Sequence, residues 1–127
     1  MTIITHALGE NYMLAKKQMD AVVLRQKALS SNLANAQVPH YKRIDVDPSF
    51  DQQLTQCLAE GDLKGFQELR PATYTDEKSS CQANGNNVEI DRELLQLNEN
   101  AVKHQFLLKV AEENVRMIRS AITGNAF

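Results

Sequence analysis

Apolar residues in the first part of the chain recur at alternating steps of four and three. This spacing keeps one face of an α-helix apolar and is typical of a helix that packs along another helix. It predicts an N-terminal heptad helix within residues 1–36, with apolar positions Leu8, Tyr12, Ala15, Met19, Val22, Leu29 and Leu33, interrupted by Gln26. At about 1.5 Å per residue, some 30 helical residues extend ~45 Å. A chain of this size cannot cover such a helix on all sides, so its stripe needs a partner.

A second helical pattern fills residues 88–127 and is the strongest periodic signal in the chain. Its apolar seam comprises Leu94, Leu97, Ala101, His104, Leu108, Ala111, Val115, Ile118 and Ile122, in steps of three and four. Asp91 is a candidate N-cap, Glu93 complements the helix dipole, and Gly124 stands where a helix commonly ends. A second stripe flanks the seam: Leu95, Val102, Phe106, Leu107, Val110, Met117 and Ala121. We expect one side of this helix to contact the N-terminal helix and the other a partner subunit.

Between the two helices, the hydrophobic period shortens to two residues. Apolar Ile44, Val46, Pro48 and Phe50 alternate with Asp45, Asp47, Ser49 and Asp51. This pattern predicts that residues 37–50 form an extended segment with one apolar side. We expect residues 51–87 to form a variable, partly flexible insert. Within this insert, a capping-box pattern before residue 51 and Gly61 after residue 60 predict a short helix over 51–60.

The rest of the insert gives weaker signals. Residues 61–75 are equally compatible with short strands and with an irregular loop. Residues 76–87 have almost no apolar positions, and Asn84-Gly85-Asn86-Asn87 is typical of a turn. We expect this stretch to be mobile.

Composition favours a thin helical body over a round globule. The 127 residues include no tryptophan and only four Phe and three Tyr, and the net charge is −2. Such a charge gives no electrostatic footprint for nucleic acid or an anionic membrane. No apolar run approaches the roughly 20 residues that span a bilayer, and the N-terminus lacks the apolar core of a cleaved signal. Composition alone therefore favours a cytoplasmic protein.

The sequence offers little catalytic or metal-binding chemistry. His6, His40 and His104 lack metal-ligand spacing, and Cys57 and Cys81 are too few for a disulfide scaffold, although they could pair outside the cytoplasm. We expect no catalytic residue, no metal and no cofactor.

Two other groups of residues also have plain structural interpretations. Asp45 and Asp47 could mimic paired acid–base carboxylates, but a solvated strand face is the favoured interpretation. The basic run from His40 to Arg43 could contact nucleic acid, which the overall charge disfavours. We therefore expect neither nucleic acid nor a small-molecule substrate as a partner, and no enzyme.

The end of the first helix carries a specific motif. The string is Ser31-Asn32-Leu33-Ala34-Asn35-Ala36-Gln37-Val38-Pro39-His40-Tyr41-Lys42-Arg43. It resembles the signature of the bacterial flagellar rod and hook proteins, Ser-x-Asn-(Ile/Leu)-Ala-Asn-x-x-Thr-Pro-Gly-Tyr. Val38 replaces Thr and His40 replaces Gly. If that glycine serves a positive φ angle, His40 shifts the turn.

The C-terminal region extends the resemblance. Val88-Glu89-Ile90-Asp91-Arg92-Glu93-Leu94, then Asn98-Glu99-Asn100 and Ile118-Arg119-Ser120-Ala121-Ile122, are similar to the proximal rod proteins of this family. The Gln-Arg-Ala-Tyr-x-Ala-Asn string that ends the distal rod and hook proteins is absent. The two resemblances cover about residues 8–50 and 85–122.

The resemblance implies a mainly α fold in which the two terminal helices pair as a coiled coil, with a small irregular or partly β insert. It implies a structural subunit of the flagellar basal-body rod, which polymerises into the axial shaft that transmits torque. Asn32, Asn35, Pro39 and Tyr41 would shape the segment that contacts neighbouring subunits. Implied partners are copies of the chain, other rod proteins, membrane-ring adaptors and the flagellar export apparatus. Implied location is the periplasmic rod, after export without a cleaved signal.

Two other classes stay open on the residues alone. A cytoplasmic helical adaptor or secretion chaperone would bind one client through the apolar seam. A thiol enzyme built on Cys57 or Cys81 is a more distant alternative.

Overall fold

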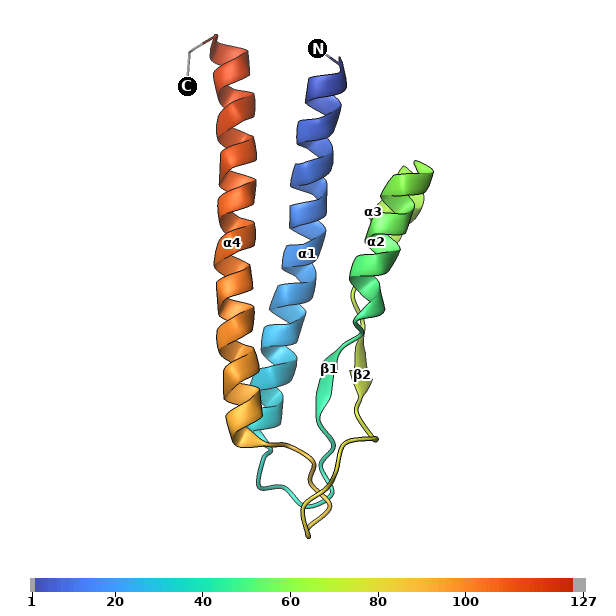
Figure 1. Cartoon of the computed structure of the whole chain (residues 1–127), viewed down its shortest axis with the longest axis vertical. Helices are drawn as coiled ribbons and strands as arrows, with labels where there is room; N and C mark the ends of the chain where they lie inside the picture. Colours follow the sequence, from blue (N-terminus) through green and yellow to red (C-terminus); the bar gives the residue numbers. More distant parts are fainter. Residues whose placement is uncertain (1, 125–127) are drawn as a thin grey trace.

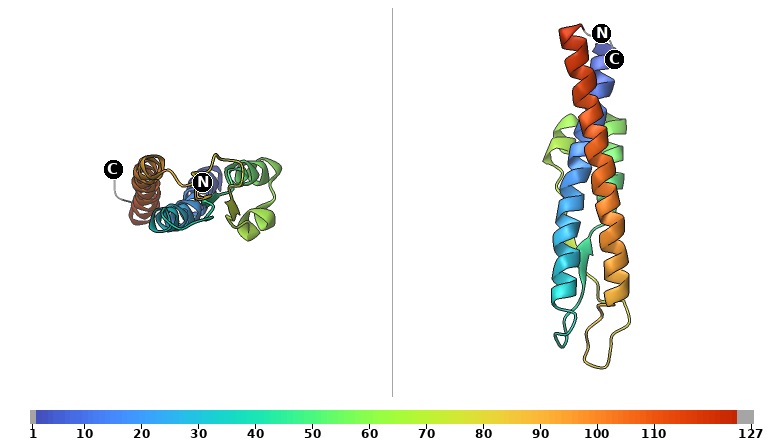
Figure 2. Two further views of the ribbon diagram at one scale, coloured as in Figure 1. Left: turned by 90° about the horizontal axis from the view of Figure 1, so that it is seen from below. Right: turned by 90° about the vertical axis from the view of Figure 1, so that its left-hand side faces the viewer.

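Two long helices lie side by side and run in opposite directions, with a small insert on the far side of the first. The computed structural model describes residues 2–124. The elements are α1 (Thr2–Ala34), β1 (Ile44–Val46), α2 (Ser49–Glu60), α3 (Leu63–Glu68), β2 (Thr73–Thr75) and α4 (Ile90–Thr123). In Figures 1 and 2, α1 lies between α4 and the insert. This arrangement confirms the predicted mainly α fold with a partly β insert.

Helix α1 ends where the asparagines crowd its last turn. The Asn35 side chain donates to the Ser31 carbonyl oxygen at 2.8 Å, and the Asn35 backbone N–H donates to the same oxygen at 3.0 Å. The Asn35 side chain therefore adds a second hydrogen bond to a carbonyl that already accepts the backbone bond, and this local contact holds the Asn35 side chain against the last turn of the helix. Pro39 follows and prevents the helix from continuing.

His40 occupies the turn that the motif usually gives to glycine, and its φ is 63°. The expected shift of the turn is therefore wrong, because His40 adopts the left-handed conformation. Its backbone N–H donates to the Asn84 carbonyl oxygen at 2.9 Å. Gly85, with φ of 82°, lies against the imidazole, and a Cβ at Gly85 would stand 2.6 Å from His40 Nδ1.

The insert has its own small core. Phe50 and Leu54 of α2 and Phe66 of α3 are buried together and pack on Met13, Leu14 and Ala21 of α1. The predicted helix over 51–60 is confirmed within α2, which ends at Gly61 with φ of 71°. Helix α3 is a feature that the sequence did not predict. Asp62 caps it by accepting a hydrogen bond from the Gly65 N–H at 2.9 Å.

Strand β1 pairs antiparallel with β2, with Asp45 opposite Tyr74. The alternating pattern correctly indicates an extended segment but assigns its faces wrongly. Asp45 is buried, whereas Ile44 and Val46 are only half-buried. A salt-bridged aspartate thus occupies the inward position, because basic side chains meet it there.

Helix α4 turns an unexpected line of residues toward α1. Its buried positions are Glu93, Asn100, Leu107 and Asn114, one every seven residues. Leu107 packs with Ala15 and Val22 of α1, and the Asn100 side chain donates to the Val22 carbonyl oxygen at 2.9 Å. The predicted seam therefore lies to one side of the contact with α1, and the second stripe lies largely to the other.

No helix within the described residues is both long enough and apolar enough to cross a bilayer.

We predict that His40→Gly stabilises the isolated chain by about 0.5 kcal/mol. Relief of a left-handed β-carbon is worth roughly 1–2 kcal/mol, and the greater freedom of unfolded glycine offsets part of that gain. Urea denaturation measures the difference. As a control, Gly85→Ala should destabilise the chain, and by less when His40→Gly has removed the imidazole. A less stable His40→Gly chain would show that the ring contact outweighs the strain.

Candidate assembly interface

Asn32 joins three parts of the chain through one buried side chain. Its Nδ2 donates to the Ile44 carbonyl oxygen at 2.8 Å and to Glu93 Oε2 at 3.1 Å. Its Oδ1 accepts hydrogen bonds from the Ile44 N–H at 2.9 Å and the Tyr41 hydroxyl at 3.0 Å. Asn32 therefore fixes the extended segment between α1 and the first turn of α4.

Arg43 is the buried charge at the centre of this arrangement, with 3% of its side chain exposed. Its Nε donates to Glu93 Oε1 at 2.7 Å, and its Nη2 donates to Asp45 Oδ2 at 3.2 Å and Gln96 Oε1 at 3.1 Å. Its Nη1 donates to Asp76 Oδ2 at 3.4 Å. Burial alone would lower the pKa of Arg43, but the bonds to Glu93 and Asp45 outweigh it and raise that pKa.

These contacts correct three interpretations of the sequence. Asp45 is not part of a solvated face, because it also pairs with Arg25 of α1 at 3.0 Å. Asp47 is exposed and accepts a hydrogen bond from the Ser49 N–H at 2.9 Å. The basic run is not a surface patch, since Arg43 is buried. Glu93, expected only to complement the helix dipole, is fully buried and paired.

The loop over residues 76–87 completes a polar cluster, which consists of Asn32, Arg43, Asp45, Asp76, Asn86, Asn87 and Glu93. Asn87 accepts a hydrogen bond from the Arg43 N–H at 2.7 Å and donates to the Asp76 carbonyl oxygen at 2.6 Å. Asn86 donates to the carbonyl oxygens of Asn35 and Val38, at 2.9 and 2.8 Å, and so covers the end of α1. The expected turn is present, but the sequence did not predict that these asparagines would be buried and fully engaged.

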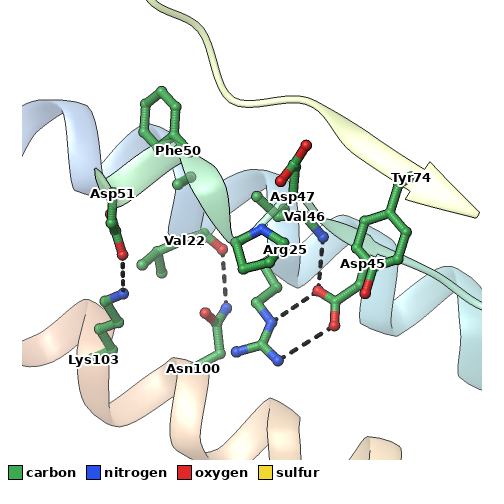
Figure 3. Close-up of a pocket in the computed structure, with 12 residues that line it drawn as sticks. Val22, Arg25, Asp45, Val46, Asp47, Phe50, Asp51, Tyr74, Asn100 and Lys103 are labelled. Atoms are coloured by element: carbon green, nitrogen blue, oxygen red, sulfur yellow. Dashed lines mark hydrogen bonds and ion pairs between the residues drawn. The ribbon is translucent and has the colours of Figure 1, made fainter. Parts of the chain in front are cut away.

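A cleft of about 270 Å³ lies between α1, α4 and the insert. Figure 3 shows Lys103 of α4 reaching Asp51 of α2 across it, at 3.6 Å, and Arg25 reaching Asp45. Within the described residues, every buried side-chain nitrogen or oxygen has a hydrogen-bond partner. No group of three acidic, His or Cys side chains there could hold a metal ion. The polar groups thus satisfy one another and fix the position of the helices.

Both flanks of α4 are exposed and apolar. One flank presents Leu95, Val102 and Phe106, with Phe106 65% exposed; the other presents Leu94, Leu108, Val115 and Ile122. A groove of about 360 Å³ lies beside the second flank and is lined by Val23, Gln26, Ala101, His104 and Gln105, among others. Several large apolar side chains exposed along one helix indicate a surface that contacts another molecule.

The residues expected from the sequence divide between the interior and this surface. On α1, Ala15, Val22 and Leu29 are buried, Tyr12, Met19 and Leu33 are half-buried, and Leu8 lies outside the residues whose side chains are described, as does His6. On α4, Leu97, Ala111 and Ile118 are half-buried, while Leu94, Ala101, Leu108, Val115 and Ile122 are exposed. Of the motif residues, Asn32 is buried, Asn35 and Tyr41 are half-buried, and Pro39 is exposed.

The sequence matches proteins of several bacteria that carry the name flagellar basal body rod protein FlgB. The Aquifex aeolicus protein is 32% identical over 119 residues, which cover 89% of this chain and 93% of the relative. This chain belongs to the FlgB family. The FlgB protein of Borreliella burgdorferi is 30% identical over 112 residues, covering 74% of the chain and 82% of the relative. That of Bacillus subtilis is 29% identical over 113 residues, covering 80% and 84%. No family model matches the sequence.

The polar cluster of this FlgB-family chain was missed by sequence reasoning. Its one visible signal is the polar line Glu93, Asn100 and Asn114, spaced by multiples of seven within an apolar helix. Asn86 and Asn87 gave no such signal, because a sequence typical of a turn does not show which other segments pack against that turn.

We predict that Arg43→Met destabilises the chain by about 3–5 kcal/mol, because it leaves Glu93 charged and buried without a cation. Arg25→Met is the matched control. Arg25 is 32% exposed, so its loss should cost about 1 kcal/mol or less. Thermal and urea unfolding provide the measurement. Adding Glu93→Gln to Arg43→Met should recover much of the loss; failure to do so would contradict the role of an unpaired charge.

Asp76 should give the chain an acid-sensitive component of stability. The Ser79 hydroxyl, aided by the Ser79 and Lys78 backbone N–H groups and by Arg43, lowers the pKa of Asp76 from 3.8 to about 2. Because the folded pKa is depressed, this stabilisation is complete above the unfolded pKa and disappears as the pH falls through about 2.

We therefore predict that Asp76→Asn costs on the order of 1 kcal/mol at neutral pH. The gap between variant and parent should narrow below pH ~4 and close near pH ~2. Urea titrations over this pH range measure it. A gap that stays constant with pH would rule out the carboxylate as the cause.

Proposed function

We propose that this chain polymerises through the two apolar flanks of α4, and that the polar cluster presents those flanks in fixed geometry. Membership of the FlgB family makes the chain a structural subunit of the flagellar basal-body rod. The observation that carries the proposal is the exposure of both flanks while α1 packs on the polar line between them. The adaptor or chaperone alternative is not favoured, since the relatives that match are rod proteins.

The energetics support association. Full burial of an exposed Val, Leu or Phe side chain contributes about 1.5–3 kcal/mol, so several such residues on each flank supply a large driving force. Among the residues whose side chains are described, the apolar core that α1 and α4 share is small: Ala15, Val22 and Leu107 are buried, and Met19 and Val110 pack against them. Stability is therefore coupled to assembly.

The two flanks favour an open polymer over a closed dimer. They lie on opposite sides of the contact with α1 and carry different residues, and the groove at His104 lies beside the flank that carries Leu94 and Leu108. Contacts between unlike surfaces propagate from subunit to subunit, and they form helical arrays when the rotation does not close. Such an array is what a torque-transmitting shaft requires.

The motif segment (residues 31–43) provides a second contact surface in this proposal. Asn32, Asn35 and Tyr41 hold it against the helices, which leaves Val38 and Pro39 exposed at the end of the molecule. These two residues are well placed to contact the next subunit along the axis. We further propose that the seam residues of both helices, from Leu8 to Ile122, pack against other helices, either within the chain or in a neighbouring subunit.

The remaining partners follow from the place of a rod in the cell envelope. We infer contacts with other rod proteins, with membrane-ring adaptors at the base, and with the flagellar export apparatus. The subunit would act in the periplasm after export without a cleaved signal, and its role would be mechanical rather than enzymatic.

We predict that Phe106→Asp and Leu108→Asp, one on each flank, abolish motility while leaving the monomer folded. Both side chains are exposed, so each change should alter monomer stability by about 0.5 kcal/mol or less. Swimming assays in a strain that lacks the native gene, with circular dichroism of each purified variant, provide the measurement.

Asn98→Asp is the matched control, because it adds the same charge at an exposed polar position of α4. This variant should swim normally. Normal swimming of Phe106→Asp and Leu108→Asp, with both proteins present in isolated basal bodies, would contradict the role of the flanks.

A further inference from the structure

Lys42 and Cys81 form a close pair that the polar cluster does not use. Lys42 Nζ lies 2.7 Å from Cys81 Sγ and also donates to the Gly85 carbonyl oxygen at 2.7 Å. The flanking residues Tyr41 and Arg43 bond to the cluster, whereas Lys42 reaches the loop over residues 76–87. Cys81 is exposed and has no disulfide. Its sulfur is thus open to solvent oxidants while an amine stands against it.

The separation of the two atoms is informative. An N–H···O hydrogen bond settles at about 2.9–3.0 Å, and sulfur is a larger atom than oxygen, so an N–H···S contact normally settles farther out. A nitrogen and a sulfur this close have the spacing that a single bridging oxygen imposes. The Gly85 hydrogen bond holds Nζ in place from a second direction.

We propose that Lys42 and Cys81 are an oxidative cross-linking site, at which one oxygen atom joins Nζ to Sγ. One dioxygen molecule reacts with the neutral amine and the thiol to give the Nζ–O–Sγ bridge and one water. The amine loses one hydrogen and the thiol loses its own, and both leave in the water with the second oxygen. Nitrogen and sulfur each give up two electrons, and these reduce the dioxygen. Hydrogen peroxide serves as an equivalent oxidant, with two peroxide molecules yielding the bridge and three waters.

The surrounding fold is already arranged for this bond. Asn87 accepts a hydrogen bond from the Arg43 N–H, and the His40 N–H donates to the Asn84 carbonyl oxygen, so the loop is docked on both sides of Lys42. A bridge would therefore form with little rearrangement, and it would fasten the loop covalently to the motif segment. Cys57 cannot replace Cys81, because it lies in α2 against the core of the insert. Figure 1 shows α2 at one end of the insert and the loop that follows β2 at the other.

The test treats the purified full chain with air or dilute hydrogen peroxide and measures the intact mass after denaturation. The expected product has gained one oxygen and lost two hydrogens. A proteolytic digest should contain a single species that joins the Lys42 and Cys81 peptides, and dithiothreitol should separate them. Cys57→Ser should give the same product in the same yield.

Lys42→Arg keeps the positive charge and a donor for the Gly85 carbonyl but cannot form the bridge, so the product should be absent. It should also be absent when the parent chain is oxidised in concentrated urea, where the pair is no longer held together. Three results would overturn the proposal: whole oxygen atoms added to Cys81 without a link to Lys42, a disulfide with Cys57, or equal yields of the linked species in urea.

Discussion

The arrangement of the two long helices and the segments that join them depends on the buried guanidinium of Arg43. Arg43 lies in the segment after α1, yet its guanidinium reaches carboxylates on β1, on the loop before α4 and on α4 itself. A buried charge is tolerated only when its partners are in place, because the cost of removing it from water is several kcal/mol. The two helices, the segment and the loop must therefore come together as a unit. Asn32 imposes the same constraint without a charge. Its buried amide needs hydrogen-bond partners, and its nitrogen and oxygen both find them in these segments.

This polar arrangement accounts for the apolar outer surface. Polar residues at a helix contact specify register at some cost in stability. Here Glu93, Asn100 and Asn114 take the positions that face α1, so most of the leucines, valines and Phe106 of α4 are displaced to its flanks. The chain thus separates two tasks on one helix. The inward line determines how α1 and α4 align, and the flanks provide the free energy for association with other rod subunits.

The general fold could be predicted from the sequence, because heptad spacing sustained over a long stretch is typical of helices that pack along one another and of little else. The same spacing did not identify which line faces α1, since hydrophobicity marks every face that is buried somewhere, including in other subunits. Asp45 shows the converse, because a charged residue is interpreted as exposed until its partners are known. One partner, Arg25, lies on α1, and the other, Arg43, is itself a charged residue that the sequence suggests is exposed. Helix α3 escaped prediction because six residues are too few for a periodic signal, and its cap at Asp62 is a common residue type in loops.

The bond from Asn100 to the Val22 carbonyl has a mechanical meaning. An apolar contact between two helices resists separation but permits sliding, because a displaced apolar side chain can make an equivalent contact with another apolar side chain. A buried amide that is hydrogen-bonded to one particular carbonyl does not permit such sliding. A shift of α4 by one turn would leave that amide without an acceptor, at a cost of about 1–3 kcal/mol. Glu93 adds a second such fixed point near the start of α4. The hydrogen bonds of Asn100 and Glu93 therefore prevent α4 from sliding along α1, so the helix pair resists shear along its length when a rotating shaft is placed under load.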